Sequence, residues 1–159
     1  MAGPSKILQG ERNAVGLRFA IVAAQFNAHV VERLLDGALR MLAEEGARAD
    51  NVDVIRVPGA FEIPLAVKQA AVARRYAAVI ALAAVIRGET PHFDYVANEC
   101  ARGVMQVMLD TGVPVGFGVL TCDTLEQAQA RAGGAAGNKG TDAARAAIEM
   151  AGLLQRLAS

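Results

Sequence analysis

The sequence predicts an α/β fold in which helices cover both faces of a parallel sheet. Short β-branched apolar runs alternate along the chain with longer segments of helical apolar periodicity, and alternating units of this kind form parallel sheets. The apolar runs lack a strict polar–apolar alternation, which is typical of strands buried on both faces. We therefore expect a buried parallel sheet between two layers of helices.

Four segments are predicted as strands, and a helical pattern follows each of them. The strands are expected at Leu17–Val22, Val52–Val57, Ala78–Ile86 and Val115–Leu120. The first helix carries an apolar face from Val30 to Leu42, with Asn27 as a candidate N-cap. The second helix runs from about Ile63 to Ala73, and Pro64 fits its first turn.

Three further helices complete the pattern. The third has an apolar face from Phe93 to Met108, with Thr90 as its candidate cap and Pro91 as its first residue. A short helix is expected at Thr124–Ala132, capped by Asp123 or Thr124, and the last begins near Asn138. The predicted order is therefore β-α-β-α-β-α-β-α-α.

The composition limits the class of protein. A chain of 159 residues fits one domain, residues 1–159, with Met1–Gly16 as an arm before the first strand. A net charge of zero removes the electrostatic argument for a nucleic-acid partner. Cys100 and Cys122 are predicted to be reduced and packed. Because the first residues form no signal peptide and the longest apolar run is too short to cross a membrane, we expect a cytoplasmic protein.

Ligands of parallel α/β sheets bind beyond the carboxyl ends of the strands, so we expect the ligand-binding residues in four loops. They are Ala23–Asn27, Pro58–Glu62, Arg87–His92 and Thr121–Asp123. The third loop contains a glycine that permits a sharp turn, and a helix N-terminus that can bind phosphate follows it. Thr90 adds a hydroxyl, and His92 supplies an imidazole with an ordinary pKa near 6.5, suited to proton transfer.

Other residues are candidates for binding. Glu62 can accept hydrogen bonds from sugar hydroxyls, and Phe26 can stack on a planar ring. Arg131 and Lys139 can hold a phosphate dianion. Taken singly, each candidate is more often structural: a helix cap, a surface histidine or cation, or, for Phe26 and still more for Phe117, a core aromatic.

The joint pattern of motifs resembles the 6,7-dimethyl-8-ribityllumazine synthases over nearly the whole chain, from about Lys6 to Leu154. The residues that carry the resemblance are Val57–Pro64, Val85–Val96, Gly116–Thr121, Glu126–Ala128 with Arg131–Gly133, and Gly137–Gly140. The resemblance implies a flavodoxin-like three-layer αβα sandwich with a four-stranded parallel sheet. It also implies a transferase of riboflavin biosynthesis that joins 5-amino-6-ribitylaminouracil to 3,4-dihydroxy-2-butanone 4-phosphate, without a metal or an organic cofactor.

The resemblance also assigns roles to residues. His92 matches the proton donor. The ribitylaminouracil site corresponds to Phe26, Ala60, Phe61, Glu62, Ala84, Val85, Ile86 and Phe117, and the butanone phosphate site to Glu89, Thr90, Arg131 and Lys139. Phe117 and Arg131 match residues that reach in from a neighbouring subunit, and Asp142 matches an acid near the histidine. Glu89 departs from expectation, because its carboxylate must point away from the phosphate.

The family forms pentamers, and some members assemble twelve of them into an icosahedral shell. The short link Gly133–Gly140 resembles that of the shell-forming members, so we expect a 60-mer. In addition, Lys6–Leu8 could pair with the sheet edge of another chain.

Two alternatives belong to other classes of protein. One is a catalytically weak flavin or lumazine binder, which would keep Phe26 but lose His92 or the phosphate cations; this chain keeps all of them. The other is a response-regulator or flavodoxin-type module. It would need clustered acids or a hydroxyl- and glycine-rich loop after the first strand, and Ala23–Asn27 has neither.

Overall fold

A computed structural model describes residue 3 and residues 5–159; Met1, Ala2 and Pro4 of the predicted arm lie outside the described residues. Its centre is a four-stranded parallel sheet with the strand order β2-β1-β3-β4. The strands are β1 (Phe19–Ala24), β2 (Val52–Val57), β3 (Ala78–Ile86) and β4 (Val115–Cys122). The predicted fold class is therefore confirmed.

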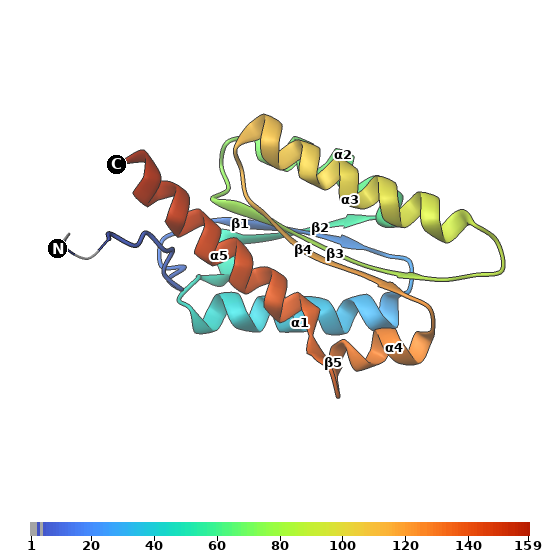
Figure 1. Cartoon of the computed structure of the whole chain (residues 1–159). Helices are drawn as coiled ribbons and strands as arrows, with labels where there is room; N and C mark the ends of the chain where they lie inside the picture. The colour runs from blue at the N-terminus through green and yellow to red at the C-terminus, as the bar shows by residue number, and fades with distance from the viewer. Residues whose placement is uncertain (1–2, 4) are drawn as a thin grey trace.

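Helices form a layer on each face of the sheet (Figure 1). One layer consists of α2 (Ile63–Val72) and α3 (His92–Thr111), and the other of α1 (Ala28–Glu44) and α5 (Lys139–Ala158). The short helix α4 (Leu125–Ala130) and a hairpin of β5 (Ala132–Gly134) and β6 (Gly137–Asn138) connect β4 to α5, while η1 (Ala49–Asn51) and η2 (Ala60–Glu62) are 3₁₀ turns. The hairpin and the 3₁₀ turns are additions to the predicted order.

The two central strands divide the core into two apolar clusters. Phe19 and Ile21 of β1 pack with α1 and α5, whereas Ala20 and Val22 pack with α2 and α3. This alternation follows from the two-residue period of a strand. Every residue of β1 is buried, as is all of β3 except Ile86. The prediction of strands buried on both faces is confirmed for these two strands.

The same prediction is wrong for the outer strands. The side chains of Val54 in β2 and Phe117 in β4 are 40% and 42% exposed. Both strands lie at the edges of the sheet. The exposure of Phe117 excludes the alternative of a core aromatic at this position. The bounds of β2 and β3 agree with the prediction. By contrast, β1 begins and ends two residues later than predicted, and β4 ends two residues later.

Glycines allow α5 to lie close to the elements below it. A Cβ atom on Gly116 of β4 would fall 2.1 Å from the carbonyl oxygen of Ala143 in α5. One on Gly140 would fall 1.9 Å from the carbonyl oxygen of Leu34 in α1. The first turn of α5 is thus fixed against α1 and β4.

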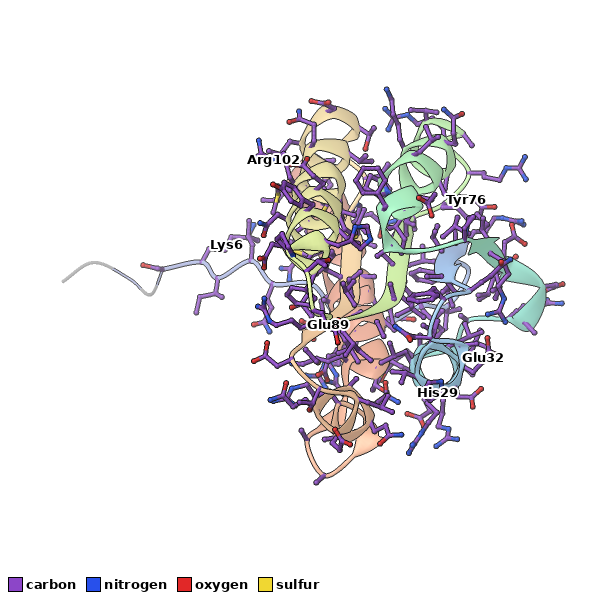
Figure 2. The ribbon with its side chains drawn as sticks, turned by 90° about the vertical axis from the view of Figure 1, so that its right-hand side faces the viewer. Lys6, His29, Glu32, Tyr76, Glu89 and Arg102 are labelled. Carbon is purple, nitrogen blue, oxygen red and sulfur yellow. The ribbon has the colours of Figure 1, made fainter. Side chains whose placement is uncertain are left out.

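The N-terminal arm is partly docked. Arg12 Nε lies 2.8 Å from Glu149 Oε1, and Arg156 Nη1 donates to the carbonyl of Gln9 at 2.7 Å. On the N-terminal side of these contacts, the segment that carries Lys6 projects away from the folded domain (Figure 2). Ile7 is 79% exposed. Among residues 3 and 5–159, no helix combines the length and the apolar character needed to cross a membrane.

Candidate active site

A cleft of about 180 Å³ opens at the carboxyl ends of β1 and β3. The chain passes from β1 to β2 on one side and then returns to β3 on the other, so the strand order reverses at this point. Such switch points are the usual ligand sites of parallel α/β sheets. The cleft is lined by Ala24, Phe26, Ala60, Ala84, Val85, Ile86, Gly88, Thr90, His92, Phe93 and Val96.

The loop after β1 holds Phe26 at this cleft. The backbone N–H of Phe26 donates to the carbonyl of Pro58 at 3.0 Å. Asn27 has a left-handed backbone, with φ at 58°, and its Nδ2 donates to the carbonyl of Ala84 at 2.7 Å. Asn27 is the N-cap of α1 as predicted, but its side chain bonds to β3 instead of capping the helix. The Phe26 ring is 72% exposed, so the alternative of a core aromatic is wrong.

The loop after β2 forms one rim of the cleft. Ala60 is buried and lines it, while Phe61 is 60% exposed and Glu62 is also exposed. All three belong to η2, and the N–H of Glu62 donates to the carbonyl of Gly59 at 3.2 Å. Phe61 and Glu62 belong to the same turn as Ala60 but do not line the cleft.

The loop after β3 forms the opposite rim and ends in α3. The helix begins at His92 with Pro91 as its N-cap, so the predicted start is one residue too early. Thr90 Oγ1 accepts a long hydrogen bond of 3.5 Å from the N–H of His92. Thr90 and the exposed His92 line the cleft together with Gly88. The N-terminus of α3, where a helix favours anions, therefore lies at the cleft.

Arg87 connects this loop to the loop after β4. Its Nε donates to Asp123 Oδ1 at 2.8 Å, and its Nη1 lies 3.6 Å from Asp94 Oδ1. The hydrogen bond to Asp123 raises the pKa of Arg87 above its ordinary value, and the charge of Asp94 adds to the effect.

The short helix α4 begins after Asp123. Of its two predicted caps, Asp123 and Thr124, it is Thr124 whose side chain accepts a hydrogen bond from the N–H of Gln127, so the second alternative is confirmed.

Besides Phe61 and Glu62, three predicted binding residues on more distant segments do not line the cleft: Phe117, Arg131 and Lys139. Arg131 Nη1 donates to the carbonyl of Gln127 at 3.0 Å. Lys139 Nζ lies 3.8 Å from Asp142 Oδ2, and Asp142 also pairs with Arg145. Glu89 does not line the cleft either; it lies on the exposed loop at the carboxyl end of the sheet (Figure 2).

Neither cysteine belongs to the cleft. Cys100 and Cys122 are both free and buried, as predicted, and burial raises the pKa of Cys100 to about 11. In the part of the chain that the structure describes, no three His, Cys, Asp or Glu side chains are grouped to hold a metal ion.

Sequence reasoning missed several contributors to this site. Ala24, Phe93 and Val96 line the cleft, and the last two follow His92 by one and four positions on α3. The four-residue spacing from His92 could have identified Val96, because positions i and i+4 share a helix face. The hydrogen bonds from Asn27 to Ala84 and from Arg87 to Asp123 join segments that are distant in the sequence, and no local sequence pattern predicts such contacts.

Comparison with known proteins identifies the family. Residues 16–155 match the family model described as 6,7-dimethyl-8-ribityllumazine synthase. The chain is 55% identical over 152 residues to the 6,7-dimethyl-8-ribityllumazine synthase of Clostridium kluyveri, covering 96% of this chain and 99% of that protein. It is 56% identical over 150 residues to the enzyme of the same name from Desulfotalea psychrophila, covering 94% and 97%. The chain therefore belongs to the 6,7-dimethyl-8-ribityllumazine synthase family.

Proposed function

We propose that this protein condenses 5-amino-6-ribitylaminouracil with 3,4-dihydroxy-2-butanone 4-phosphate to form 6,7-dimethyl-8-ribityllumazine, with release of phosphate and water. One observation carries the proposal. In a chain of this family, the cleft at the β1/β3 switch point combines an exposed aromatic ring, a strand end, a helix N-terminus and a histidine. These features meet the chemical needs of both substrates.

The ribitylaminouracil is assigned to the side of the cleft formed by β1, η2 and β3. Phe26 offers its exposed ring for stacking on the pyrimidine. The backbone at Ala84–Ile86 supplies hydrogen-bonding groups for the edge of the pyrimidine. Glu62 accepts from the hydroxyls of the ribityl chain, and Ala60 and Phe61 shape the same rim.

The butanone phosphate is assigned to the loop between β3 and α3. Gly88 lets the backbone approach the ligand, Thr90 donates a hydroxyl, and the N-terminus of α3 favours the phosphate dianion. The Glu89 carboxylate is exposed and does not line the cleft, which agrees with a side chain turned away from the phosphate. Arg131 and Lys139 are assigned as the phosphate cations of a neighbouring subunit's site.

In the proposed reaction, the 5-amino group attacks the ketone carbon, and the carbinolamine loses water to give an imine. Phosphate then leaves by β-elimination, the enol tautomerises, and attack by the ribitylamino nitrogen closes the ring with loss of a second water. His92 donates and accepts protons in these steps. Holding the two reactants together supplies much of the acceleration, so the reaction needs positioning and proton transfer only.

We propose further that the protein assembles into pentamers, and that twelve pentamers form a 60-mer. Three exposed features support self-association: Phe117 on the edge strand β4, the projecting Ile7 and an apolar groove between α3 and α5. The groove includes Met105, Leu109, Met150 and Leu154. Exposed apolar surfaces of this kind mark protein interfaces. The mass in solution, measured by light scattering after gel filtration, tests this assembly.

The decisive assay mixes the purified protein with the two substrates and follows lumazine absorbance. We expect product to form rapidly, and His92→Ala to slow its formation while leaving measurable activity, because orientation by the cleft survives. Protein of pentameric or larger mass that forms no product above the uncatalysed background would contradict the proposed reaction.

A further inference from the structure

Arg87 joins three segments around the cleft that are separate in the sequence. Its side chain reaches Asp123, after β4, at 2.8 Å and Asp94, in the first turn of α3, at 3.6 Å. The guanidinium carbon also lies 4.5 Å from the centroid of the Phe93 ring, within the range of a cation–π contact. The backbone N–H of Arg87 donates to the carbonyl of Cys122 at 2.9 Å. One residue thus connects β3, α3 and the loop after β4.

Little else holds the loop that Arg87 begins. Within the described chain, the hydrogen bonds made by residues 88–91 are the long contact between Thr90 and His92 and a 3.0 Å bond from the N–H of Asp94 to the carbonyl of Pro91. Both are local, so neither ties the loop to another element. A Cβ atom on Gly88 would have no neighbour within 4 Å, which shows that the loop is not packed there.

Asp123, in contrast, is firmly anchored. Its N–H donates to Gln127 Oε1 at 2.8 Å, and the N–H of Gln127 donates to Thr124 Oγ1 at 3.2 Å. The N–H of Thr124 also donates to Gln127 Oε1, at 3.4 Å, and with the bond to Thr124 Oγ1 it forms the capping box of α4. The bond from the Asp123 N–H adds to this box and holds the backbone at the carboxylate. Arg87 therefore links a weakly held loop to a well-held one.

We propose that Arg87 is a positioning residue, which holds the loop of residues 88–92 against the loop after β4 so that Thr90 and His92 keep their places along the cleft. The proposal rests on the proposed function, in which this loop binds the phosphate of the ketone substrate. A planar guanidinium suits the role because it can pair with two carboxylates and lie over a ring at once, whereas an ammonium is a single point charge.

Charge gives a second reason for an arginine. Asp94 and Asp123 are two carboxylates near a loop that is assigned to a phosphate dianion, and Arg87 pairs with both of them. Loss of Arg87 would free the loop and also leave these carboxylates to repel the substrate. Both consequences weaken binding of the ketone phosphate, and neither acts directly on the ribitylaminouracil.

The role can be separated from folding. The side chains of Arg87, Asp94 and Asp123 are all about half exposed, and exposed ion pairs contribute little to global stability. Arg87→Met keeps much of the side chain's apolar length and removes its charge and donors. The matched control is Arg48→Met, which removes an arginine that pairs with Asp50 before the amino end of β2, away from the cleft.

Steady-state kinetics of Arg87→Met, Arg87→Lys and Arg48→Met test the proposal. We expect Arg87→Met to raise the KM for the ketone phosphate about 10-fold and to leave the KM for ribitylaminouracil within about 2-fold. Arg87→Lys should restore part of the loss, and Arg48→Met should behave like the wild type. An unchanged KM for the ketone phosphate, or equal rises in both KM values, would overturn the proposal.

A double-mutant cycle asks whether Arg87 acts through Asp123. If it does, Arg87→Met should raise the KM for the ketone phosphate far less in an Asp123→Ala background than in the wild type, by about 2-fold or less. A full 10-fold rise in that background would show that Asp123 is not the anchor and would overturn the proposal.

Hydrogen exchange of the N–H groups of Arg87, His92 and Asp94, which donate hydrogen bonds at the two ends of the loop, gives a readout that does not depend on activity. Exchange should be faster in Arg87→Met than in Arg48→Met, with the same melting temperature for both. Equal exchange rates would contradict a positioning role. If the wild-type protein formed no lumazine, the proposed function would fail, while the exchange experiment would still decide whether Arg87 holds the loop.

Discussion

The two halves of the proposed site are built in different ways. Phe26, Ala84–Ile86, Thr90 and His92 line one cleft of a single chain, where hydrogen bonds join the ends of β1 and β3. Phe117, Arg131 and Lys139 lie outside this cleft, on the edge strand β4 and around the β5–β6 hairpin. In the proposed function, the fold of one chain therefore organises the half that binds the pyrimidine and transfers protons. The proposal assigns the phosphate cations to the cleft of a neighbouring subunit.

The largest loss of activity should follow a substitution in the half of the site that lies within one chain. His92→Ala should lower kcat about 100-fold, because it removes the general acid and base. His29→Ala is the matched control, since His29 is exposed on α1 and does not line the cleft. Stopped-flow or steady-state absorbance measures both variants. A complete loss of activity in a correctly assembled His92→Ala protein would mean that positioning contributes less than we propose.

A substitution in the half of the site assigned to a second subunit should weaken substrate binding more than it slows turnover. Arg131→Ala should raise the KM for the ketone phosphate about 10- to 100-fold, the range expected when a charge-assisted hydrogen bond is lost. The KM for ribitylaminouracil should change little. Initial rates at varied ketone phosphate measure the effect, and an unchanged KM would remove Arg131 from the site.

The stacking residue should give a smaller effect on the other substrate. Phe26→Ala should raise the KM for ribitylaminouracil about 2- to 10-fold, in line with the strength of aromatic pairs. Because the ring is 72% exposed, the melting temperature should stay close to that of the wild type. Phe26→Trp keeps a stacking surface and should restore binding. Equal KM values in Phe26→Ala and the wild type would show that the ring does not stack on the pyrimidine.

The smallest effect should come from the hydrogen bond that connects β1 to β3. Asn27→Ala loses the bond to Ala84 and places a Cβ-bearing residue without a polar side chain in a left-handed conformation, whereas Asn27→Gly loses only the bond. We expect Asn27→Gly to be the more stable variant by about 1 kcal/mol. Urea unfolding measures this difference, and the reverse order would show that the left-handed backbone is not the source of the cost.

The sequence predicted the positions of the strands better than their exposure. The bounds of β3 are those expected because a buried apolar run is a clear local signal, and those of the half-exposed β2 follow its β-branched residues. The exposure of Phe26 and Phe117 could not be read from composition, since it depends on which other parts of the folded chain cover each ring. The hydrogen bond from Arg87 to Asp123 was not predicted either, because the two residues are 36 positions apart in the sequence. Loop position and chemistry nominated Phe26, Glu62, Thr90 and His92, and the resemblance to the family added the strand end Ala84–Ile86. All of these except Glu62 line the cleft of one chain.

Subunit complementation tests most directly whether the site is shared between chains. His92→Ala and Arg131→Ala chains, each with a different tag, are co-expressed, and assemblies that carry both tags are isolated. If Arg131 serves a neighbour's cleft, random mixing in a ring restores about a quarter of the sites to the wild-type set. The mixed assemblies should then approach that fraction of the wild-type rate at low ketone phosphate, well above either variant alone. A rate equal to the average of the two separate variants would contradict the account and place Arg131 and His92 in the site of the same chain.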